Sequence, residues 1–370
     1  MPLYHSSAAV LGFCSVIAAG SALALGRRFS RSTFWQEVHA TQATLIQYVG
    51  ETCRYLLSAP PSTLDKTHKV RVAYGNGLRP DVWRRFKERF RIETIAEFYA
   101  ATESPLALWN LSTSNFTEGA VGYSGKFMRF LLGMKSRIIE IDIETNTPRR
   151  DPKTGFCIVA KANQPGELIS RLDENNVSLG FQGYYGNSKA SESKVMRNVF
   201  RKGDAWFSTG DIMRKDNDDR WYFHDRVGDT FRWKSENVST AEVSQTLGTL
   251  PGVAEANVYG VRLPHHDGRA GCAAIKFETE YPINEALLGR LAKHAATGLP
   301  KYALPLFLRI TNEIQATGTN KQQKHKLREE GVDPEKVVHS GDNLYWLKDG
   351  SYRPFGETEW NELRHGRVKL

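Results

Sequence analysis

The sequence predicts an α/β protein with two domains, and three observations support this. The chain has 370 residues, enough for two or more hydrophobic cores. In its first part, short strands alternate with segments of helical periodicity, as in a mixed sheet covered by helices. From Arg226 the pattern changes to a compact α+β arrangement. We therefore expect a large domain over residues 1–225, which includes a smaller β subdomain, and a second domain over residues 226–370.

Composition narrows the classes of function. A hydrophobic content of 40% and a charged content of 25% are ordinary for a globular protein. The formal net charge of +9 favours anionic partners, such as nucleotides, CoA or an acidic lipid surface. The basic residues are spread along the chain without a basic tract or a zinc finger, which argues against nucleic acid.

The cysteines carry no metal-binding pattern. Cys14, Cys53, Cys157 and Cys272 are isolated from one another, so we expect reduced core residues of an intracellular protein and no metal site of their own. The pair at His265 and His266 has no partner at ligand spacing, and a hairpin tip is the favoured interpretation.

Residues 7–25 are apolar and small, and their length approaches that of a membrane-spanning helix. No basic segment precedes them, and their alanines, serines and glycines make them only mildly hydrophobic. We expect a buried helix of the large domain, with a membrane segment or signal peptide as the alternative.

Residues 33–57 predict a helix, a short buried strand and a second helix. Residues 69–74 alternate apolar and polar side chains as a strand does, and a glycine loop follows at residues 75–77. Pro80 then opens a helix with an apolar stripe. A loop between a strand and a helix lies where α/β sheets usually bind ligands, although a tight turn requires glycine in any case.

Further strands are expected along the rest of the large domain. A strand at residues 92–98 delivers Tyr99, Thr102 and Glu103 to the same edge as the glycine loop. The other strand segments are residues 139–144, 155–161 and 166–170, and a hairpin turns at residues 216–220.

The second domain begins with a helix signal. Ser239 and Glu242 stand at capping-box spacing. Strands through residues 258–261 and up to about Phe277 flank a turn at residues 267–268, and a helix starts at Asn284.

Five motifs give the chain a family resemblance. Residues 97–104 read EFYAATES, residues 207–211 read FSTGD, residues 225–239 read DRVGDTFRWKSENVS, residues 1–6 read MPLYHS and residues 317–324 read TGTNKQQK. In order and wording they resemble the adenylate-forming (AMP-binding) superfamily, and within it the fatty-acid transport proteins, also called very-long-chain acyl-CoA synthetases. The resemblance covers nearly all of this chain but only the C-terminal part of a family member. It implies a truncated adenylate-forming large domain followed by a small mobile domain.

The resemblance also implies a reaction. ATP and a fatty acid would form an acyl-adenylate, and the CoA thiol would then displace AMP, with Mg²⁺ as the cofactor and fatty-acid uptake as the coupled process. Such chemistry requires positioned charges and a dry pocket rather than a protein nucleophile.

Residue roles follow from the matching motifs. Gly75, Asn76 and Gly77 would pass along the adenine, and Tyr99 would stack on it. The alternative for Tyr99 is an aromatic residue at the sheet edge.

The charged and hydroxyl groups would serve the phosphates and the ribose. Thr102 would hydrogen-bond the phosphate, and Glu103 would ligate Mg²⁺, with a carboxylate at a helix start as its alternative. Asp211 and Arg226 would hold the ribose hydroxyls.

The last motif would complete catalysis. Lys321 would neutralise the charge that develops between the fatty-acid carboxylate and the α-phosphate, whereas Lys324 and Lys326 are interpreted as a solvated basic face. Gly228 and Asp229 are the expected hinge of a rotation of the small domain.

Several departures from the family leave alternatives open. The chain lacks the glycine-rich phosphate loop that the family carries upstream of the MPLYHS motif, and Ala100, Ser235 and Asn320 replace the usual residues. A catalytically impaired homologue that handles lipids or binds a partner is one alternative, and a CoA ligase for aryl or other carboxylic acids in a secondary-metabolite pathway is another. The expected location is an intracellular membrane of the peroxisome, endoplasmic reticulum, lipid droplet or plasma membrane, although the C-terminal VKL falls short of a peroxisomal signal.

Overall fold

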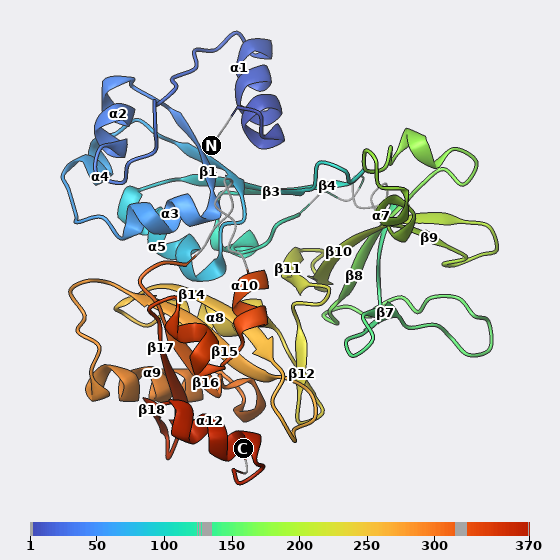
Figure 1. The fold of residues 1–370 in the computed structure, drawn as a ribbon. Helices are drawn as coiled ribbons and strands as arrows, with labels where there is room; N and C mark the ends of the chain where they lie inside the picture. Colours follow the sequence, from blue (N-terminus) through green and yellow to red (C-terminus); the bar gives the residue numbers. More distant parts are fainter. Residues whose placement is uncertain (1–2, 124, 126, 128–134, 315–323, 369) are drawn as a thin grey trace. The chain divides into compact units, whose positions relative to one another are not determined.

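The computed structural model describes residues 3–123, 125, 127, 135–314, 324–368 and 370 (Figure 1). The chain forms two compact units. The first comprises Met1–Asp142 with Thr147–His224, and the second comprises Ile143–Asn146 with Asp225–Leu370. Each unit has its own sheets and hydrophobic core, and each is described separately below.

A four-stranded sheet organises the first part of unit one (Figure 1). Its strands β1, β2 and β3 are parallel to one another, and β4 is antiparallel to β3. The elements are α2 (Phe34–Ala40), β1 (Leu45–Val49), α3 (Gly50–Leu57), α4 (Leu64–Thr67), β2 (Val72–Asn76), α5 (Pro80–Phe90), β3 (Thr94–Ala100) and β4 (Ala107–Ser112). The expected order of helix, strand and helix over residues 33–57 is confirmed.

Helix α5 shows why these residues fold as they do. Pro80 occupies its first turn, where a missing N–H group costs nothing. Its expected apolar stripe is completely buried and contributes to the core that covers the sheet. The residues of this stripe are Val82, Trp83, Phe86 and Phe90.

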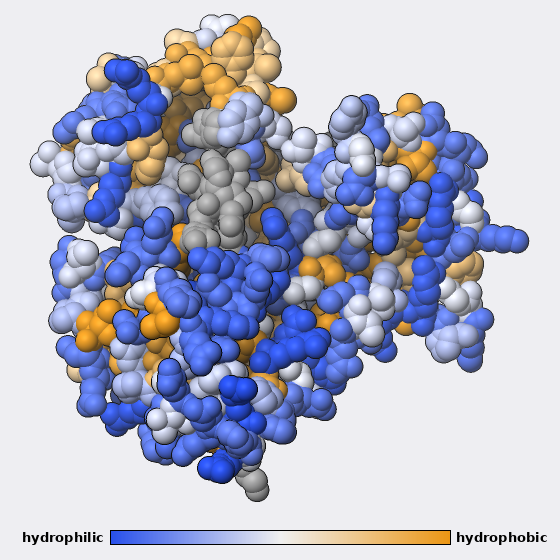
Figure 2. Space-filling view, in the orientation of Figure 1, coloured by the Kyte–Doolittle hydropathy of each residue, from blue (hydrophilic) through white to orange (hydrophobic). Residues whose placement is uncertain are grey.

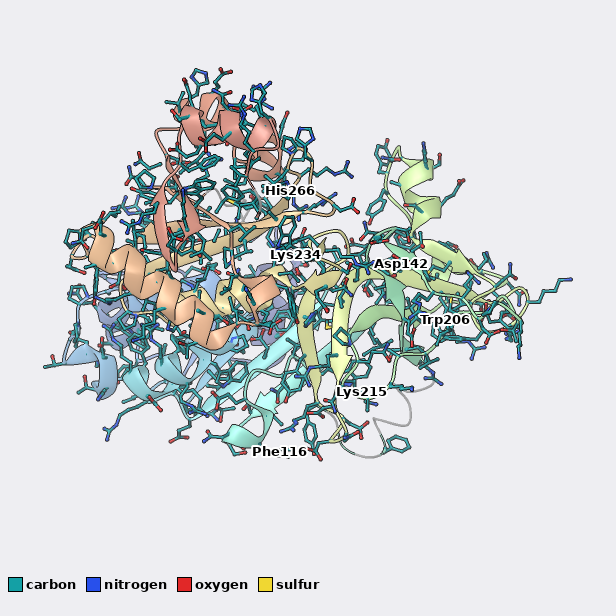
Figure 3. All side chains as sticks on the ribbon, turned by 90° about the horizontal axis from the view of Figure 1, so that it is seen from below. Phe116, Asp142, Trp206, Lys215, Lys234 and His266 are labelled. Carbon is teal, nitrogen blue, oxygen red and sulfur yellow. The ribbon has the colours of Figure 1, made fainter. Side chains whose placement is uncertain are left out.

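The rest of unit one is a β subdomain whose main sheet has the order β11-β10-β8-β5, with β9 paired to β10. Trp206 anchors one side of it, because its indole N–H donates to Asp204 and its ring packs edge-on against Phe200 (Figure 3). The elements are η2 (Asn115–Thr117), β5 (Ser136–Ile139), β6 (Ile141–Asp142), β7 (Thr147–Pro148), β8 (Gly166–Arg171), η3 (Val177–Leu179), α7 (Ser188–Ser193), β9 (Val195–Arg197), β10 (Ala205–Lys215) and β11 (Trp221–Arg226).

The strand expected at residues 155–161 is absent from this described segment. Only isolated bridges form there, at Cys157 and Val159. The backbone N–H groups of Cys157, Ile158 and Ala160 donate to three different segments of the chain, at Val199, Arg149 and Ile138, so no continuous ladder develops.

The N-terminal segment also differs from expectation. Residues 7–18 form a π-helical stretch η1 (Ser7–Cys14) and a short helix α1 (Ser15–Ala18), with Val10 56% and Ile17 61% exposed. The side chains of this segment are apolar or small on every side of the helix, but only Ser7, Ala8 and Gly12 are buried. The expected buried helix is therefore wrong. The exposed residues form the orange area at the top of Figure 2. Cys14 is exposed as well, whereas the other three cysteines are buried as expected.

Within the described residues, no helix combines the length and the apolar character that crossing a membrane requires.

Unit two is built on a five-stranded sheet of order β14-β15-β16-β17-β18, in which only β15 and β16 run parallel. The two expected helix starts are confirmed, since Ser239 caps one helix by accepting the N–H of Glu242, and Asn284 caps the other by accepting that of Leu287. The elements are β12 (Phe231–Trp233), β13 (Glu236–Val238), α8 (Thr240–Gly248), β14 (Val253–Val261), β15 (Ala270–Phe277), α9 (Glu285–Gly298), η4 (Lys301–Ala303), β16 (Phe307–Ile310), α10 (His325–Glu330), α11 (Pro334–Val338), β17 (Asn343–Lys348), β18 (Ser351–Pro354) and α12 (Glu357–Arg364).

Candidate functional site

The glycine segment at residues 75–77 lies at the end of β2, with Gly75 and Asn76 still inside the strand. Tyr48 on β1, Gly75 on β2 and Glu97 on β3 are direct neighbours across the sheet. A Cβ atom on Gly75 would lie 2.2 Å from the Tyr48 carbonyl oxygen and 2.6 Å from its ring. The Tyr48 backbone carbonyl and ring therefore both exclude a side chain at position 75, whether or not a ligand binds.

The phenol of Tyr48 reaches across β2 to Glu97. Its O–H donates to Glu97 Oε2 at 2.5 Å, and Glu97 Oε1 accepts the backbone N–H of Gly77 at 2.5 Å and that of Leu78 at 3.2 Å. Glu97 is completely buried, and this burial raises its pKa to about 8, although its three hydrogen bonds oppose the shift. Burial, together with the charge of Glu97, also raises the pKa of Tyr48.

Asn76 carries an unsatisfied acceptor in this segment. No donor among the described residues reaches Asn76 Oδ1, although this atom is buried. A buried polar atom without a partner is costly unless a ligand or a water satisfies it. An amide oxygen of this kind fits the exocyclic amino group of adenine.

Tyr99 and Asp211 are brought together from positions 112 residues apart. The phenol O–H of Tyr99, near the end of β3, donates to Asp211 Oδ2 at 2.7 Å. Asp211 lies within an irregularity of β10, where the pairing with β8 shifts between Ser208 and Ile212. Such a bulge redirects the side chains next to it.

The bulge in β10 is held by a second buried carboxyl group. Glu167 Oε1 accepts the hydroxyl of Ser208 at 2.5 Å and the N–H of Gly210 at 3.1 Å. Burial raises the pKa of Glu167. Thr209 completes the turn, because its hydroxyl donates to the Leu168 carbonyl at 2.6 Å and accepts the N–H of Asp211 at 3.1 Å.

Thr102 and Glu103 lie in the loop after β3 and contact other segments. The hydroxyls of Thr102 and Ser6 share a hydrogen bond of 3.3 Å, which connects the EFYAATES motif with the MPLYHS motif. Glu103 Oε1 accepts the phenol O–H of Tyr184 at 3.2 Å. Burial raises the pKa of Tyr184, and the charge of Glu103 adds to that increase.

The described part of the chain contains no group of three or more His, Cys, Asp or Glu side chains that could hold a metal ion. This is compatible with Mg²⁺, because proteins commonly bind that ion through one or two carboxylates and leave the remaining positions to substrate phosphates and water. Glu103 is half-buried and keeps a carboxylate at the loop, so its chemistry fits the predicted role.

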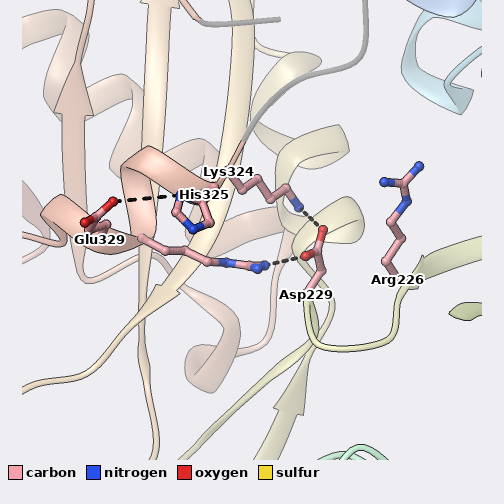
Figure 4. A pocket seen from close by; sticks show the side chains of 6 residues that line it. Arg226, Asp229, Lys324, His325 and Glu329 are labelled. Carbon is pink, nitrogen blue, oxygen red and sulfur yellow. Dashed lines mark hydrogen bonds and ion pairs between the residues drawn. The ribbon is translucent and has the colours of Figure 1, made fainter. Parts of the chain in front are cut away.

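Arg226 and Asp229 belong to unit two, where they line a pocket of about 510 Å³ (Figure 4). Gly228, between them, has a φ of +84°, which glycine adopts without strain. The N–H of Asp229 donates to the Arg226 carbonyl at 3.0 Å and closes the turn. The role of Gly228 and Asp229 as a hinge stays a prediction.

Asp229 is bound firmly to helix α10. Its carboxylate pairs with Lys324 Nζ at 3.0 Å and with the guanidinium of Arg328 (Figure 4). Burial would raise the pKa of Asp229, but these two cations outweigh it and lower the pKa.

The interpretation of Lys324 as part of a solvated basic face is wrong. Lys324 Nζ also donates to Thr240 Oγ1 at 2.6 Å, and Thr240 is in turn bound by Asp225. Burial lowers the pKa of Lys324, and the negative charges of Asp225 and Asp229 oppose this shift. Lys326 does extend towards solvent.

Lys321 and Asn320 lie outside the described residues, so their predicted roles stay predictions. Glu97, Tyr48, Glu167 and Tyr184 are the residues that sequence reasoning missed. One of them could have been found, since Glu97 is an acidic residue inside an otherwise apolar strand pattern.

Comparison with known proteins identifies the class. The AMP-binding enzyme family matches residues 1–180, and its C-terminal domain family, described as AMP-binding enzyme C-terminal domain, matches residues 242–321. The chain belongs to the AMP-binding enzyme family, and its fold is that of part of the adenylate-forming large domain followed by the C-terminal domain.

Among characterised relatives, the chain is similar over its whole length to the very long-chain fatty acid transport proteins of Cochliobolus heterostrophus, at 45% identity, and Saccharomyces cerevisiae, at 43%. Isopenicillin N epimerase component 1 of Hapsidospora chrysogena is 42% identical over 98% of the chain. The chain covers 57%, 56% and 61% of these three proteins, respectively, and thus spans a little over half of their length.

Solved structures agree on the fold. ATP-bound MatB from Rhodopseudomonas palustris superimposes with a TM-score of 0.68 at 20% identity, and covers 89% of this chain and 58% of its own. The o-succinylbenzoate CoA synthetase MenE of Bacillus subtilis, in complex with its acyl-adenylate intermediate, gives 0.65 at 22% identity, over 90% of this chain and 60% of its own.

Proposed function

We propose that this protein takes part in the ATP-dependent activation of a long-chain or very-long-chain fatty acid to its acyl-CoA, through an acyl-adenylate, coupled to fatty-acid uptake. The observation that carries the proposal is the contact between Tyr99 and Asp211 beside the glycine segment, in a chain of the AMP-binding family. The names of the relatives at 43–45% identity support the choice of acid. Association with an intracellular membrane stays a prediction.

Each role in the first unit has a physical basis. Tyr99 offers a ring to the adenine, while its hydroxyl orients Asp211 towards the ribose. Asn76 offers the free acceptor to the purine amino group. Thr102 and Glu103 serve the phosphate side, where Mg²⁺ held by Glu103 would neutralise phosphate charge.

Two residues of the C-terminal part keep the roles that the resemblance implies. Arg226 contacts the ribose hydroxyls, and Lys321 neutralises the charge that develops between the carboxylate and the α-phosphate. The terminal sulfur of CoA is the proposed acceptor of the acyl group.

A second candidate is the activation of a different carboxylic acid. The relative from Hapsidospora chrysogena carries a different name at 42% identity, close to the identity of the transport proteins. Family membership at this level therefore does not fix the acid, and a panel of fatty and aryl acids distinguishes the two candidates.

The test is calorimetry of AMP and ATP binding to the 370-residue chain, with and without Mg²⁺, combined with an assay of CoA ester formation. We expect ATP binding that Mg²⁺ strengthens, and we expect Glu103→Ala to lose the Mg²⁺ effect while it retains AMP binding. Glu192→Ala, at an exposed position of α7, is the matched control and should behave as the wild type.

Absence of both AMP and ATP binding by the folded wild-type chain would refute the nucleotide site. Nucleotide binding without any CoA ester would instead support the catalytically impaired homologue.

A further inference from the structure

Glu97 is a buried acid to which the proposed chemistry gives no task. It is completely buried on β3, between Tyr48 on one side and the end of the glycine segment on the other. Isolated burial of a carboxyl group is unfavourable, so a position of this kind requires compensation by hydrogen bonds. Three donors provide it, and two of them are the consecutive backbone N–H groups of Gly77 and Leu78.

These two N–H groups belong to the segment that presents Asn76. Gly77 has a φ of +79°, which glycine adopts without strain, and its N–H points to the buried Glu97 carboxyl group. Gly50 packs against the same point, because a Cβ atom on it would lie 1.7 Å from the Gly77 carbonyl oxygen. The backbone after Asn76 is thus held from two sides, by Gly50 and by the Glu97 carboxyl group.

We propose that Glu97 is a positioning residue for the base-binding segment: by accepting the N–H groups of Gly77 and Leu78 it fixes the backbone of residues 76–78, and so fixes the Asn76 amide that receives the amino group of a purine. The inference rests on the proposed nucleotide site. In this role Glu97 acts through Asn76, because its carboxyl group is buried and is occupied by three donors of the protein.

Substitutions separate this role from simple packing. In Glu97→Gln the amide oxygen still accepts both N–H groups and the amide nitrogen donates to the Tyr48 oxygen, so the segment keeps its shape. In Glu97→Ala both N–H groups lose their acceptor. Glu97→Asp keeps the acid but shortens the side chain by one methylene, which moves the carboxylate away from the segment.

The experiment measures AMP affinity by calorimetry and hydrogen–deuterium exchange of residues 75–78 in the full chain, well below the unfolding temperature. We expect Glu97→Ala and Glu97→Asp to weaken AMP binding by about 10-fold to 100-fold and to speed exchange at residues 77 and 78. Glu97→Gln should stay within about threefold of the wild type in AMP affinity, with unchanged exchange.

Two controls report stability alone. Ile95→Val removes a methylene from the completely buried neighbour on β3 and lowers stability without touching the segment. Tyr48→Phe removes the third donor but leaves both backbone bonds to Glu97 intact. Both should keep AMP affinity within about threefold of the wild type.

The outcomes are distinct. If Glu97→Asp binds AMP as tightly as the wild type, or if Ile95→Val weakens binding as much as Glu97→Ala does, the positioning role is overturned. If the folded wild type binds no AMP, the proposed function fails, and exchange still decides whether Glu97 holds the segment. If Glu97→Ala does not fold, the comparison of Glu97→Asp with Glu97→Gln gives the answer.

Discussion

Glu97 also makes the stability of the first unit depend on pH. Its pKa is about 8 in the folded protein because of burial, against an ordinary value of 4.5. The folded state therefore retains a proton that the unfolded chain releases earlier. The protonated Glu97 carboxyl group therefore stabilises the folded state fully below about pH 4.5, and this contribution is lost as the pH rises through about 8. Tyr48 on β1 and Cys53 on α3 are the titratable groups that face Glu97, and burial raises the pKa of each.

We expect Glu97→Gln to remove this pH dependence, because its amide cannot ionise. Relative to Glu97→Gln, the free energy of unfolding of the wild type should decrease steadily between about pH 5 and pH 8. Urea unfolding of both proteins at four pH values across this range provides the measurement. Parallel curves for the two proteins would show that the carboxyl group does not titrate there.

The motifs of the sequence predicted some of the site residues but not the contacts between them. Tyr99 and Asp211 were found because each stands in a recognisable motif, although nothing in the spacing of 112 residues predicted their hydrogen bond. The contact between Tyr48 and Glu97 became visible only through the register of the sheet, which aligns both with Gly75. Register depends on tertiary packing, which short motifs do not encode.

Within strand β2, position 75 tolerates no side chain. In Gly75→Ala the new methyl group would meet the Tyr48 carbonyl oxygen, which belongs to the backbone of a neighbouring strand and cannot move aside cheaply. We expect a loss of about 1–3 kcal/mol or more in the free energy of unfolding. Thermal or urea unfolding of the full chain measures it.

Gly289 is the matched control, since it lies within helix α9 and a Cβ atom there would meet nothing closer than Ser351 Oγ at 3.8 Å. Gly289→Ala should increase stability by up to about 1 kcal/mol, because alanine is the better helix former. Equal effects of the two substitutions would contradict the packing argument at Gly75.

Helices and strands with a clear periodic pattern of apolar residues were predicted correctly, and each element that was predicted wrongly has a physical reason. Helix α5 and strands β1 to β3 followed from apolar patterns that have one buried side. The N-terminal segment has no polar side, so its pattern could not distinguish a buried helix from the exposed one observed. Strands β17 and β18 complete the second sheet, but no prediction was made for them.

At the scale of the molecule, the second unit has a core of its own. The buried residues of this core all lie between Phe231 and Leu363. The segment Ile143–Asn146 adds an ion pair of 2.5 Å between Glu144 and Arg232, but both side chains are exposed, so its contribution is about 1 kcal/mol or less.

We therefore expect a fragment of residues 225–370 to fold without the rest of the chain. Near-ultraviolet circular dichroism and a cooperative thermal transition are the measurements. A fragment of residues 226–370 differs only by Asp225, whose buried carboxylate accepts the N–H of Thr240 at 2.7 Å and its hydroxyl at 3.0 Å. The shorter fragment should be less stable by about 1–3 kcal/mol. Two fragments of equal stability would show that Asp225 is dispensable to this unit.

The line of Tyr48, Gly75 and Glu97 across three strands has a consequence for the evolution of the family. The phenol can cross the middle strand only while position 75 lacks a side chain, and the acid stays satisfied only while a donor arrives from position 48. A side chain at position 75 would clash with Tyr48, and loss of the phenol would leave Glu97 Oε2 without its donor. Homologues should therefore have exchanged the three together, so that this trio is inherited as a block or is absent as a block.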